Sequence, residues 1–429
     1  MSLKLIVILV ALIGGLYSLL LNIVSALSAN NPTPENLKDV YDAETYEKWK
    51  KYSGEHSRVK IISSIVGCLI TIILISTNAY AAFASLFPHV SAFWQVFAVI
   101  LLESVVGIIT GTIFGYISTM KIEEKYGFNR TTIGTFILDR IKSFIAELGL
   151  SIGIVYLIGV SHNALGVWMI PVFTVVAFAV TMLISFLYPL LSRIGNKFTP
   201  LGDGELKDAL TGLLDKYGYK VKAIEVMDAS RRTTKLNAYF TGFGKMKTIV
   251  LYDNLVNAMS TEEICAVFAH ELGHGLHKDV QKAQVLNVFQ FILIGAMAWG
   301  VSELSIGWDF YHEFGFDYLL LSSSHPSSWV ANYGFVYILL GIGLAVLQPI
   351  TGFIMNARSR RAEYRADRQA VIEGYGEAMI SALKKLARDN FAHLSPSFIN
   401  VILEYSHPPI NRRIKSIEKC MKRLSKSGK

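Results

Sequence analysis

Seven long apolar stretches run through the sequence, and they restrict its possible folds more than any other feature. Their approximate bounds are 3–26, 60–87, 92–118, 144–160, 164–191, 284–304 and 330–356. A helix needs roughly 20 apolar residues to cross the hydrocarbon core of a bilayer. The composition agrees, because 52% of the residues are hydrophobic and 17% are charged, unlike an average soluble domain. The sequence therefore predicts a mainly α-helical protein with seven transmembrane helices.

The basic residues are sorted between the loops that join these stretches. Loops 88–91, 161–163 and 305–329 contain no Lys or Arg. Of the 41 basic residues in the chain, all except Lys4 and Lys60 lie in the other loops and the C-terminal tail. Seven spans place those basic segments on a single face, and basic loops stay in the cytosol. We therefore expect the N-terminus outside. The net charge of +8 then reflects topology and attraction to anionic lipids, and it requires no nucleic-acid partner.

Two polar regions, about 193–283 and 357–429, fall on the predicted cytosolic face. They divide the chain into spans one to five with their loops (1–192), a first catalytic part (193–283), spans six and seven (284–356) and a second catalytic part (357–429). The cysteines lie far apart in sequence and match neither a disulfide framework nor a cysteine metal site. They are Cys68, Cys265 and Cys420. The polar parts are therefore expected in a reducing compartment.

A metal-binding motif occupies the first polar region. Ser260–Glu263 forms an S-x-x-E capping box that predicts a helix start, and the helix continues into His270-Glu271-Leu272-Gly273-His274. Residues four apart share a helix face, so His270 and His274 can direct two imidazoles at one ion. Glu271 lies where it can polarise a metal-bound water and later protonate the leaving amine. This motif predicts a zinc metalloprotease.

The third ligand is expected in the second polar region. A catalytic zinc needs three protein ligands and an open fourth position, and Glu363 is the best candidate, just beyond the seventh stretch. Asp367 lies one turn further on, where a carboxylate can orient a ligand histidine through its ring N–H. Taken alone, such a pair in a basic helix is usually a salt-bridged surface pair. The histidine motif needs a partner, which favours one Zn²⁺ per chain.

Three segments near the metal motif have the pattern of strands, at 223–228, 237–243 and 247–253. The last two are expected to form a hairpin with a turn at Gly244. An exposed edge strand there could pair with an extended peptide, and Asn237, which precedes Ala238 and Tyr239, could contact the substrate backbone. An Asn at a strand start is otherwise usually a turn residue.

A second histidine stands in the basic tail. His407 precedes two prolines, in Tyr405–Pro409, and the first proline favours an extended backbone at the histidine. A side chain held in this way could donate a hydrogen bond to the oxyanion of a tetrahedral intermediate. From these residues alone a structural role is the stronger interpretation.

The whole set of motifs resembles the type I CAAX prenyl protease family of integral-membrane zinc endopeptidases, over nearly the whole chain. The resemblance rests on Asp42-Ala43-Glu44-Thr45-Tyr46, Ile122-Glu123-Glu124-Lys125-Tyr126-Gly127-Phe128-Asn129, Asn196-Lys197-Phe198-Thr199-Pro200-Leu201, Leu236-Asn237-Ala238-Tyr239-Phe240, Ile249-Val250-Leu251-Tyr252-Asp253, the metal motif, Ser359-Arg360-Arg361 with Glu363 and Asp367, and Ser406-His407-Pro408-Pro409. The loop motifs separate this family from other membrane zincins. The resemblance implies a ring of seven helices around a water-filled chamber, capped by a zincin-like α+β catalytic domain.

The resemblance also implies roles for single residues. It makes Glu363 the third zinc ligand, with Asp367 beside it, and it places Asn237 and His407 in the catalytic site, against the structural interpretations above. Arg413 matches the arginine that follows the family's His-Pro-Pro motif, which implies that it anchors substrate or the local network. In one departure, Arg365 stands where the family often has an acidic or amide residue.

Three functions compete. The leading prediction is zinc-dependent endoproteolysis near the C-terminus of prenylated, CAAX-type proteins by a Glu271-activated water, with His407 polarising the carbonyl. A membrane quality-control protease of the HtpX type is the second, and its smaller number of spans counts against it. A non-proteolytic scaffold or metal transporter is the third. Glu103, inside the third stretch, suits an ion pathway, but the metal motif is complete, which favours an enzyme.

The expected setting follows from these predictions. We expect a multi-pass protein of the endoplasmic reticulum membrane in a eukaryote, or of the plasma membrane in a prokaryote, with its catalytic domain facing the cytosol. Its partners would be a peptide or protein substrate and the lipid bilayer, and the protein itself is expected to be a monomer.

Overall fold

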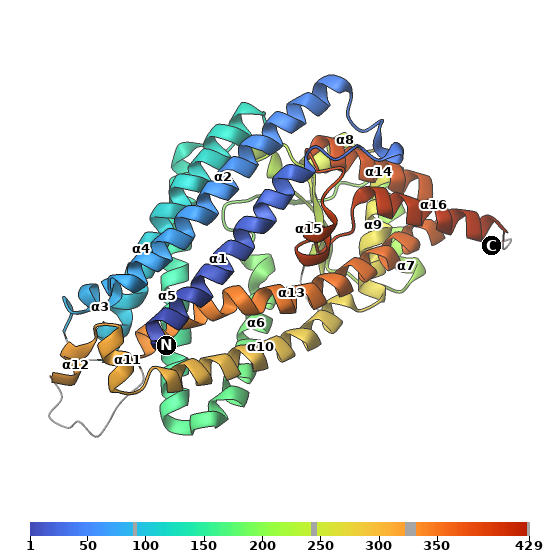
Figure 1. The fold of residues 1–429 in the computed structure, drawn as a ribbon. Coiled ribbons are helices and arrows are strands. Elements are labelled where there is room, and N and C mark those ends of the chain that lie inside the picture. Colours follow the sequence, from blue (N-terminus) through green and yellow to red (C-terminus); the bar gives the residue numbers. More distant parts are fainter. Residues whose placement is uncertain (89–91, 242–246, 322–331, 427–429) are drawn as a thin grey trace.

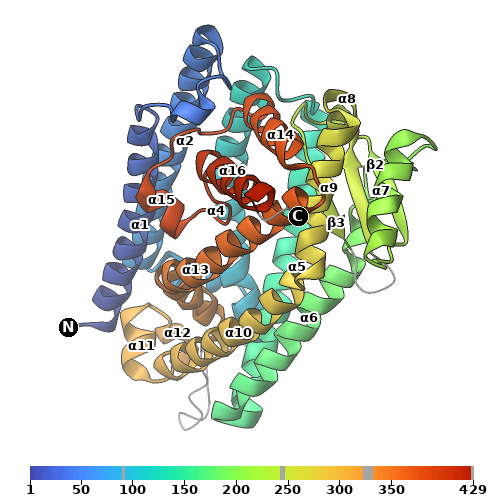
Figure 2. The same cartoon turned by 90° about the vertical axis from the view of Figure 1, so that its right-hand side faces the viewer.

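Long helices dominate the computed structural model, which describes residues 1–88, 92–241, 247–321 and 332–426. They form a bundle, and a small sheet with shorter helices lies at one end of it (Figures 1 and 2). The long helices are α1 (Leu3–Ser28), α2 (Ala43–Ser76), α4 (Ala92–Tyr116), α5 (Ile133–Leu165), α6 (Met169–Leu191), α10 (Asp279–Leu304) and α13 (Tyr333–Ile372).

Six helical segments in the described residues are long and apolar enough to cross a membrane. One of them, 133–191, contains both α5 and α6. The two helices are separated at Gly166, which has a positive φ of 53°, followed by a 3₁₀ turn over Gly166–Trp168. Glycine tolerates this backbone conformation because it lacks a Cβ. The seven predicted stretches therefore lie in six continuous segments.

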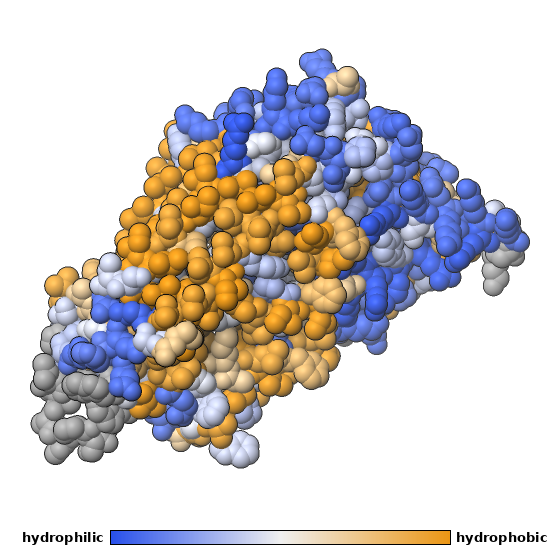
Figure 3. Space-filling view, viewed as in Figure 1, coloured by the Kyte–Doolittle hydropathy of each residue, from blue (hydrophilic) through white to orange (hydrophobic). Residues whose placement is uncertain are grey.

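A broad apolar band covers the bundle, and hydrophilic residues gather at the end that carries α14 and α16 (Figure 3). Many apolar side chains on the long helices of the bundle are exposed, including Leu20, Ile109 and Leu183. An exposed apolar surface of this size would drive a protein in water to aggregate. It is suited to lipid, as the apolar stretches predict.

Two predicted stretches differ from the helices that contain them. The second stretch, 60–87, is not a single helix, because α2 ends at Ser76 and Asn78 then adopts a positive φ of 55°. The seventh stretch, 330–356, ends within α13, which continues to Ile372. The division of the chain expected at residue 356 therefore falls inside a 40-residue helix.

The sheet has four strands in the order β1-β2-β4-β3. β2 and β4 are parallel, whereas β1 pairs with β2 and β3 with β4 in antiparallel fashion. The strands are β1 (Phe198–Pro200), β2 (Ala223–Met227), β3 (Ala238–Thr241) and β4 (Thr248–Tyr252). The last three match the predicted strands, and the turn expected at Gly244 lies outside the described residues. β3 stands at the edge of the sheet.

The shorter helices complete the polar end and the opposite end of the bundle. At the polar end they are α7 (Glu205–Lys216), α8 (Asp253–Ala258), α9 (Thr261–Leu276), α14 (Gly376–Asp389), α15 (Phe398–Leu403) and α16 (Ile410–Lys426). At the opposite end they are α3 (Ala79–Ala84), α11 (Trp308–Glu313) and α12 (Asp317–Leu321). A π-helical turn, η2 (Ile117–Glu123), extends α4 toward the polar end.

α9 begins with the predicted capping box. The Ser260 hydroxyl accepts a hydrogen bond from the backbone N–H of Glu263, and the Glu263 carboxylate accepts one from the N–H of Ser260. The same carboxylate also accepts hydrogen bonds from Ser381 and Lys385 of α14, each 2.6 Å long. Apolar residues then anchor α9 in the core, with Phe268 and Leu272 fully buried. The start and the face of the metal-motif helix are therefore both fixed.

α9 lies close against α13 at Gly273. A Cβ built on Gly273 would lie 3.0 Å from Cα of Ala366 and 3.0 Å from Cβ of Gln369. These distances are shorter than ordinary van der Waals contact, and one of them is to backbone. Glycine thus permits the approach that brings the two histidines of α9 next to the acidic residues of α13.

The substitution Gly273→Val should separate the two helices. We expect the free energy of unfolding to fall by about 1–3 kcal/mol, the usual effect of overpacking, measured as thermal stability in detergent. Gly212→Ala in α7 is the control, because nothing lies within 4 Å of its Cβ position and loss of backbone freedom stabilises by about 0.4–1 kcal/mol. Equal stability of the two variants would contradict the close-approach argument.

Candidate metal centre

His270, His274 and Glu363 form one cluster between α9 and α13. Their possible ligand atoms all lie within 4.8 Å of one another. Nε2 of His274 is 3.3 Å from Oε1 of Glu363, and Nε2 of His270 is 3.6 Å from Oε2. The histidine rings are perpendicular, with centroids 4.9 Å apart. The structure therefore brings together the three residues predicted as ligands, from two helices far apart in sequence.

Carboxylates hold the far nitrogen of each histidine ring. Oδ1 of Asp367 lies 2.9 Å from Nδ1 of His270, and Oδ2 of Asp279 lies 3.1 Å from Nδ1 of His274. A carboxylate that accepts a hydrogen bond from Nδ1–H fixes the plane of the ring and directs Nε2 away from itself. Both Nε2 atoms consequently face the same centre, beside the Glu363 carboxylate.

The centre has the electrostatic character of a cation site. Burial alone would lower the pKa of His274, but the hydrogen bond and the negative charge of Glu363 outweigh it and raise the pKa to about 9. Oε2 of Glu363 is buried without a hydrogen-bond partner, although a buried carboxylate oxygen normally has one. Two imidazoles and a carboxylate are a common ligand set for a catalytic divalent metal. The residues present fit such an ion.

Arg413 lies beneath the cluster and joins its two acidic residues. The guanidinium donates from Nε and Nη2 to the two oxygens of Asp367, at 2.9 and 2.6 Å, and Nη1 lies 3.3 Å from Oε2 of Glu363. Burial by itself would lower the pKa of Arg413, but Asp367 and Glu363 raise it above its usual value. Its side chain is 9% exposed, so it holds the carboxylates in place from the protein side.

The contact of Asp279 with His274 was not predicted from the sequence. Asp279 is the first residue of α10 and follows Lys278, whose φ of 55° breaks the helix after α9. No helical spacing therefore connects it with His274. Its Oδ1 accepts a hydrogen bond from Arg365, 2.6 Å long. Arg365, which departs from the family pattern, thus has a structural role in this chain, because it binds the Asp279 carboxylate that contacts His274.

A cavity of about 760 Å³ opens beside the cluster, with Glu271 and His274 in its wall. Ala238 and Tyr239 of β3 line the same cavity, as do residues of α6 and α10. Burial raises the pKa of Tyr239 to about 12, so its hydroxyl stays protonated at neutral pH. The edge strand and the metal motif therefore face one space.

His407 and Asn237 stand in different relations to the cluster. Nε2 of His407 lies 3.3 Å from Oε1 of Glu363, and the side chain is 64% exposed. Nδ1 of His407 is 2.9 Å from the hydroxyl of Ser406, another residue of the cavity wall. Asn237 precedes β3 with an exposed side chain, and its oxygen accepts a hydrogen bond from the N–H of Ala238. The structure thus places His407 at the cluster and Asn237 beside the strand.

A helical bundle with an apolar band, joined to a two-histidine, one-glutamate cluster beside a further glutamate, defines a membrane metalloprotease. Two family models match the chain and together span most of it. Residues 23–193 match the CAAX prenyl protease N-terminal domain with five membrane helices, and residues 200–421 match peptidase family M48. The chain therefore belongs to the CAAX prenyl proteases of peptidase family M48.

Individual relatives agree over nearly their whole length. CAAX prenyl protease 1 of Saccharomyces cerevisiae is 30% identical over 407 residues, which cover 90% of this chain and 88% of that protein. The Arabidopsis thaliana homolog is 29% identical over 418 residues, 90% of each chain. The crystal structure of S. mikatae Ste24p has a TM-score of 0.86 at 27% identity and covers 97% of this chain and 99% of its own. The chain is an integral membrane metalloendopeptidase of this family.

Removal of the Asp279 carboxylate should weaken metal binding. We expect Asp279→Ala to lower the affinity for Zn²⁺ about 10–100-fold, the usual effect of losing a group that orients a ligand, measured by competition with a chromogenic chelator. Asp215→Ala, at an exposed position of α7, is the control. An affinity equal to that of the wild type would show that Asp279 does not orient His274.

Proposed function

We propose that this protein is a zinc-dependent endopeptidase that cleaves near the C-terminus of prenylated, CAAX-type proteins. One observation carries the proposal: Glu271 and His274, which belongs to the cluster with His270 and Glu363, line the same cavity as Ala238 and Tyr239 of the edge strand β3. The substrate class comes from the relatives, which are named CAAX prenyl proteases.

The side chains around the cavity would divide the chemistry. A zinc ion held by the three ligands would supply a Lewis acid that activates water and polarises the scissile carbonyl. Glu271 accepts the proton of the attacking water and delivers it to the leaving amine. His407 donates a hydrogen bond to the oxygen on which negative charge develops. These roles agree with the position of Glu271 in the cavity wall and of His407 at the cluster.

The substrate would bind along β3. An edge strand has unpaired backbone groups, and an extended peptide can satisfy them as an added strand. Ala238 and Tyr239 would then contact the peptide from the cavity wall, with Asn237 at the start of the strand. Arg413 would act through Asp367 and Glu363, because its guanidinium is buried against both carboxylates.

We further propose the membrane arrangement. α5 and α6 are counted as two spans, since a turn at Gly166 separates them, which makes seven helices around a chamber. The sorting of the basic residues supports a cytosolic catalytic domain, zincin-like in its combination of a small sheet with the metal-motif helix, and an N-terminus outside. The membrane is that of the endoplasmic reticulum in a eukaryote or the plasma membrane in a prokaryote. We propose that the active form is a monomer.

Glu271→Gln should separate metal binding from catalysis. The substitution removes the base but preserves the shape of the side chain, so kcat should fall about 10²–10⁴-fold while one zinc per chain remains. Peptide cleavage and metal analysis of the purified protein measure the two effects. Glu262→Gln, exposed on the same helix, should keep wild-type activity. Full activity of Glu271→Gln would refute the assigned role.

The proposed substrate class predicts a preference for prenylated peptides. Each buried methylene contributes about 0.8 kcal/mol, so burying only two carbons of the prenyl chain lowers KM about tenfold. We expect a farnesylated CAAX peptide to be cleaved with a lower KM than its unprenylated twin, and a chelator to stop both reactions. Equal KM values, or a preference for an unfolded membrane protein, would favour a quality-control protease instead.

A further inference from the structure

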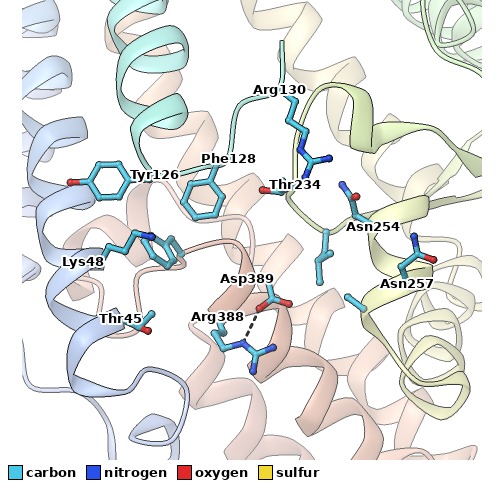
Figure 4. A pocket seen from close by; sticks show the side chains of 13 residues that line it. Thr45, Lys48, Tyr126, Phe128, Arg130, Thr234, Asn254, Asn257, Arg388 and Asp389 are labelled. Carbon is cyan, nitrogen blue, oxygen red and sulfur yellow. Dashed lines mark hydrogen bonds and ion pairs between the residues drawn. The ribbon is translucent and has the colours of Figure 1, made fainter.

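The family-specific motif Ile122–Asn129 spans the end of η2 and the start of the loop that leads to α5, and the metal centre does not account for it. The loop runs beside the segment Thr233–Leu236, which leads into β3, and Figure 4 shows Phe128 and Arg130 next to Thr234. Polar backbone contacts join the two segments: a bridge between Asn129 and Thr233, Arg130 N–H to Arg232 O (3.0 Å), and Thr234 N–H to Phe128 O (3.3 Å). The motif therefore holds the approach to the edge strand.

A partly buried carboxylate, that of Glu123, strengthens this junction. Nζ of Lys235 donates hydrogen bonds to Oε1 of Glu123 at 3.0 Å and to the hydroxyl of Tyr52 at 3.2 Å. The Tyr52 hydroxyl donates to the same oxygen of Glu123, 2.7 Å away, and Nε2 of His56 lies 3.3 Å from it. The Glu123 side chain is 17% exposed. Hydrogen bonds to an ionised partner are shorter and stronger than neutral ones. Lys235 is thereby tied to α2 and to η2, two membrane-helix elements.

Leu236, the residue after Lys235, is hydrogen bonded to a different part of the chain. Asn390, which follows α14, accepts a hydrogen bond from the N–H of Leu236 (2.8 Å) and donates one to its carbonyl (3.1 Å). Asn237, Ala238 and Tyr239 come directly afterwards. The start of β3 is therefore held by hydrogen bonds of Lys235 to α2 and η2 and by hydrogen bonds of Leu236 to Asn390.

Apolar packing holds this segment only in part, because Leu236 is buried in a hydrophobic core whereas the side chain of Lys235 is 33% exposed. A cavity of about 610 Å³ lies against it, and Tyr126, Phe128, Thr234 and Leu236 are part of the wall (Figure 4). β3 itself is short, and among the described residues β4 is its neighbour in the sheet. With one neighbouring strand and a cavity at its approach, the strand gains a further anchor from the polar contacts of Lys235 and Leu236, in addition to the apolar packing of Leu236 and Ala238.

We propose that Lys235, Glu123 and Tyr52 are positioning residues that set the location of β3 relative to the metal centre. The inference rests on the proposed function, in which β3 binds the peptide. Ala238 and Tyr239 share the cavity wall with Glu271, so a displaced strand carries the bound peptide away from that base. A displacement of about 1 Å can lower the rate on the order of 10²-fold.

The test is Lys235→Met in the full-length protein, assayed on the farnesylated peptide. We expect kcat/KM to fall on the order of 10²-fold, mainly through kcat, with the zinc content unchanged. Lys235→Arg, which keeps the charge and the donors, should restore wild-type values. Lys125→Met is the matched control, since Lys125 pairs with Glu55 of α2 at 2.5 Å but is exposed and lies apart from the strand.

A second variant and a second measurement complete the test. Tyr52→Phe removes one hydroxyl and should lower kcat by a smaller factor. An unchanged kcat in both variants, or a loss of zinc together with activity, would overturn the inference. If the wild type does not cleave the peptide, the proposed function fails, and hydrogen exchange then decides the inference alone. The amides of residues 238–241 should exchange faster in Lys235→Met than in Lys125→Met, and equal rates would refute it.

Discussion

The close contact between α9 and α13 is the interaction on which the rest of the catalytic structure depends. Gly273 lets the backbones approach until a Cβ would lie 3.0 Å from Ala366, and the histidines one turn apart on α9 then face Glu363 on α13. The contact is permitted by a residue inside the metal motif itself. Helix packing and metal binding are therefore requirements on the same few residues, which explains why the motif can specify both.

The buried charges around this contact are consistent with a metal site, and their burial is energetically unfavourable without a bound cation. Glu363, Asp367 and Arg413 are buried together, and burial of charged groups is unfavourable unless each is paired and hydrogen bonded. Arg413 pairs with both carboxylates, yet one oxygen of Glu363 keeps no hydrogen-bond partner. Asp367 and Asp279 contact Nδ1 of His270 and of His274, respectively. The network is complete at every position except the centre that the ligand atoms face.

The membrane helices contribute to the site in two ways. Glu363 lies on α13, the same continuous helix that contains the last apolar segment, so its carboxylate is connected directly to the bundle. α2 and η2 reach the approach to β3 through Tyr52 and Glu123. The positions of the metal cluster and of the edge strand are thus both fixed relative to the membrane helices.

The sequence by itself determined the apolar segments, the helix start at Ser260, three of the four strands and the cluster of His270, His274 and Glu363. These features follow from local periodicity, capping or a motif whose chemistry demands a further ligand. Tertiary structure alone decided the role of Asp279, the short strand β1 and the contact of Lys235 with Glu123. They depend on segments that meet only after folding: the break at Lys278 removes any periodic relation between Asp279 and His274, and no spacing in the chain relates Lys235 to Glu123.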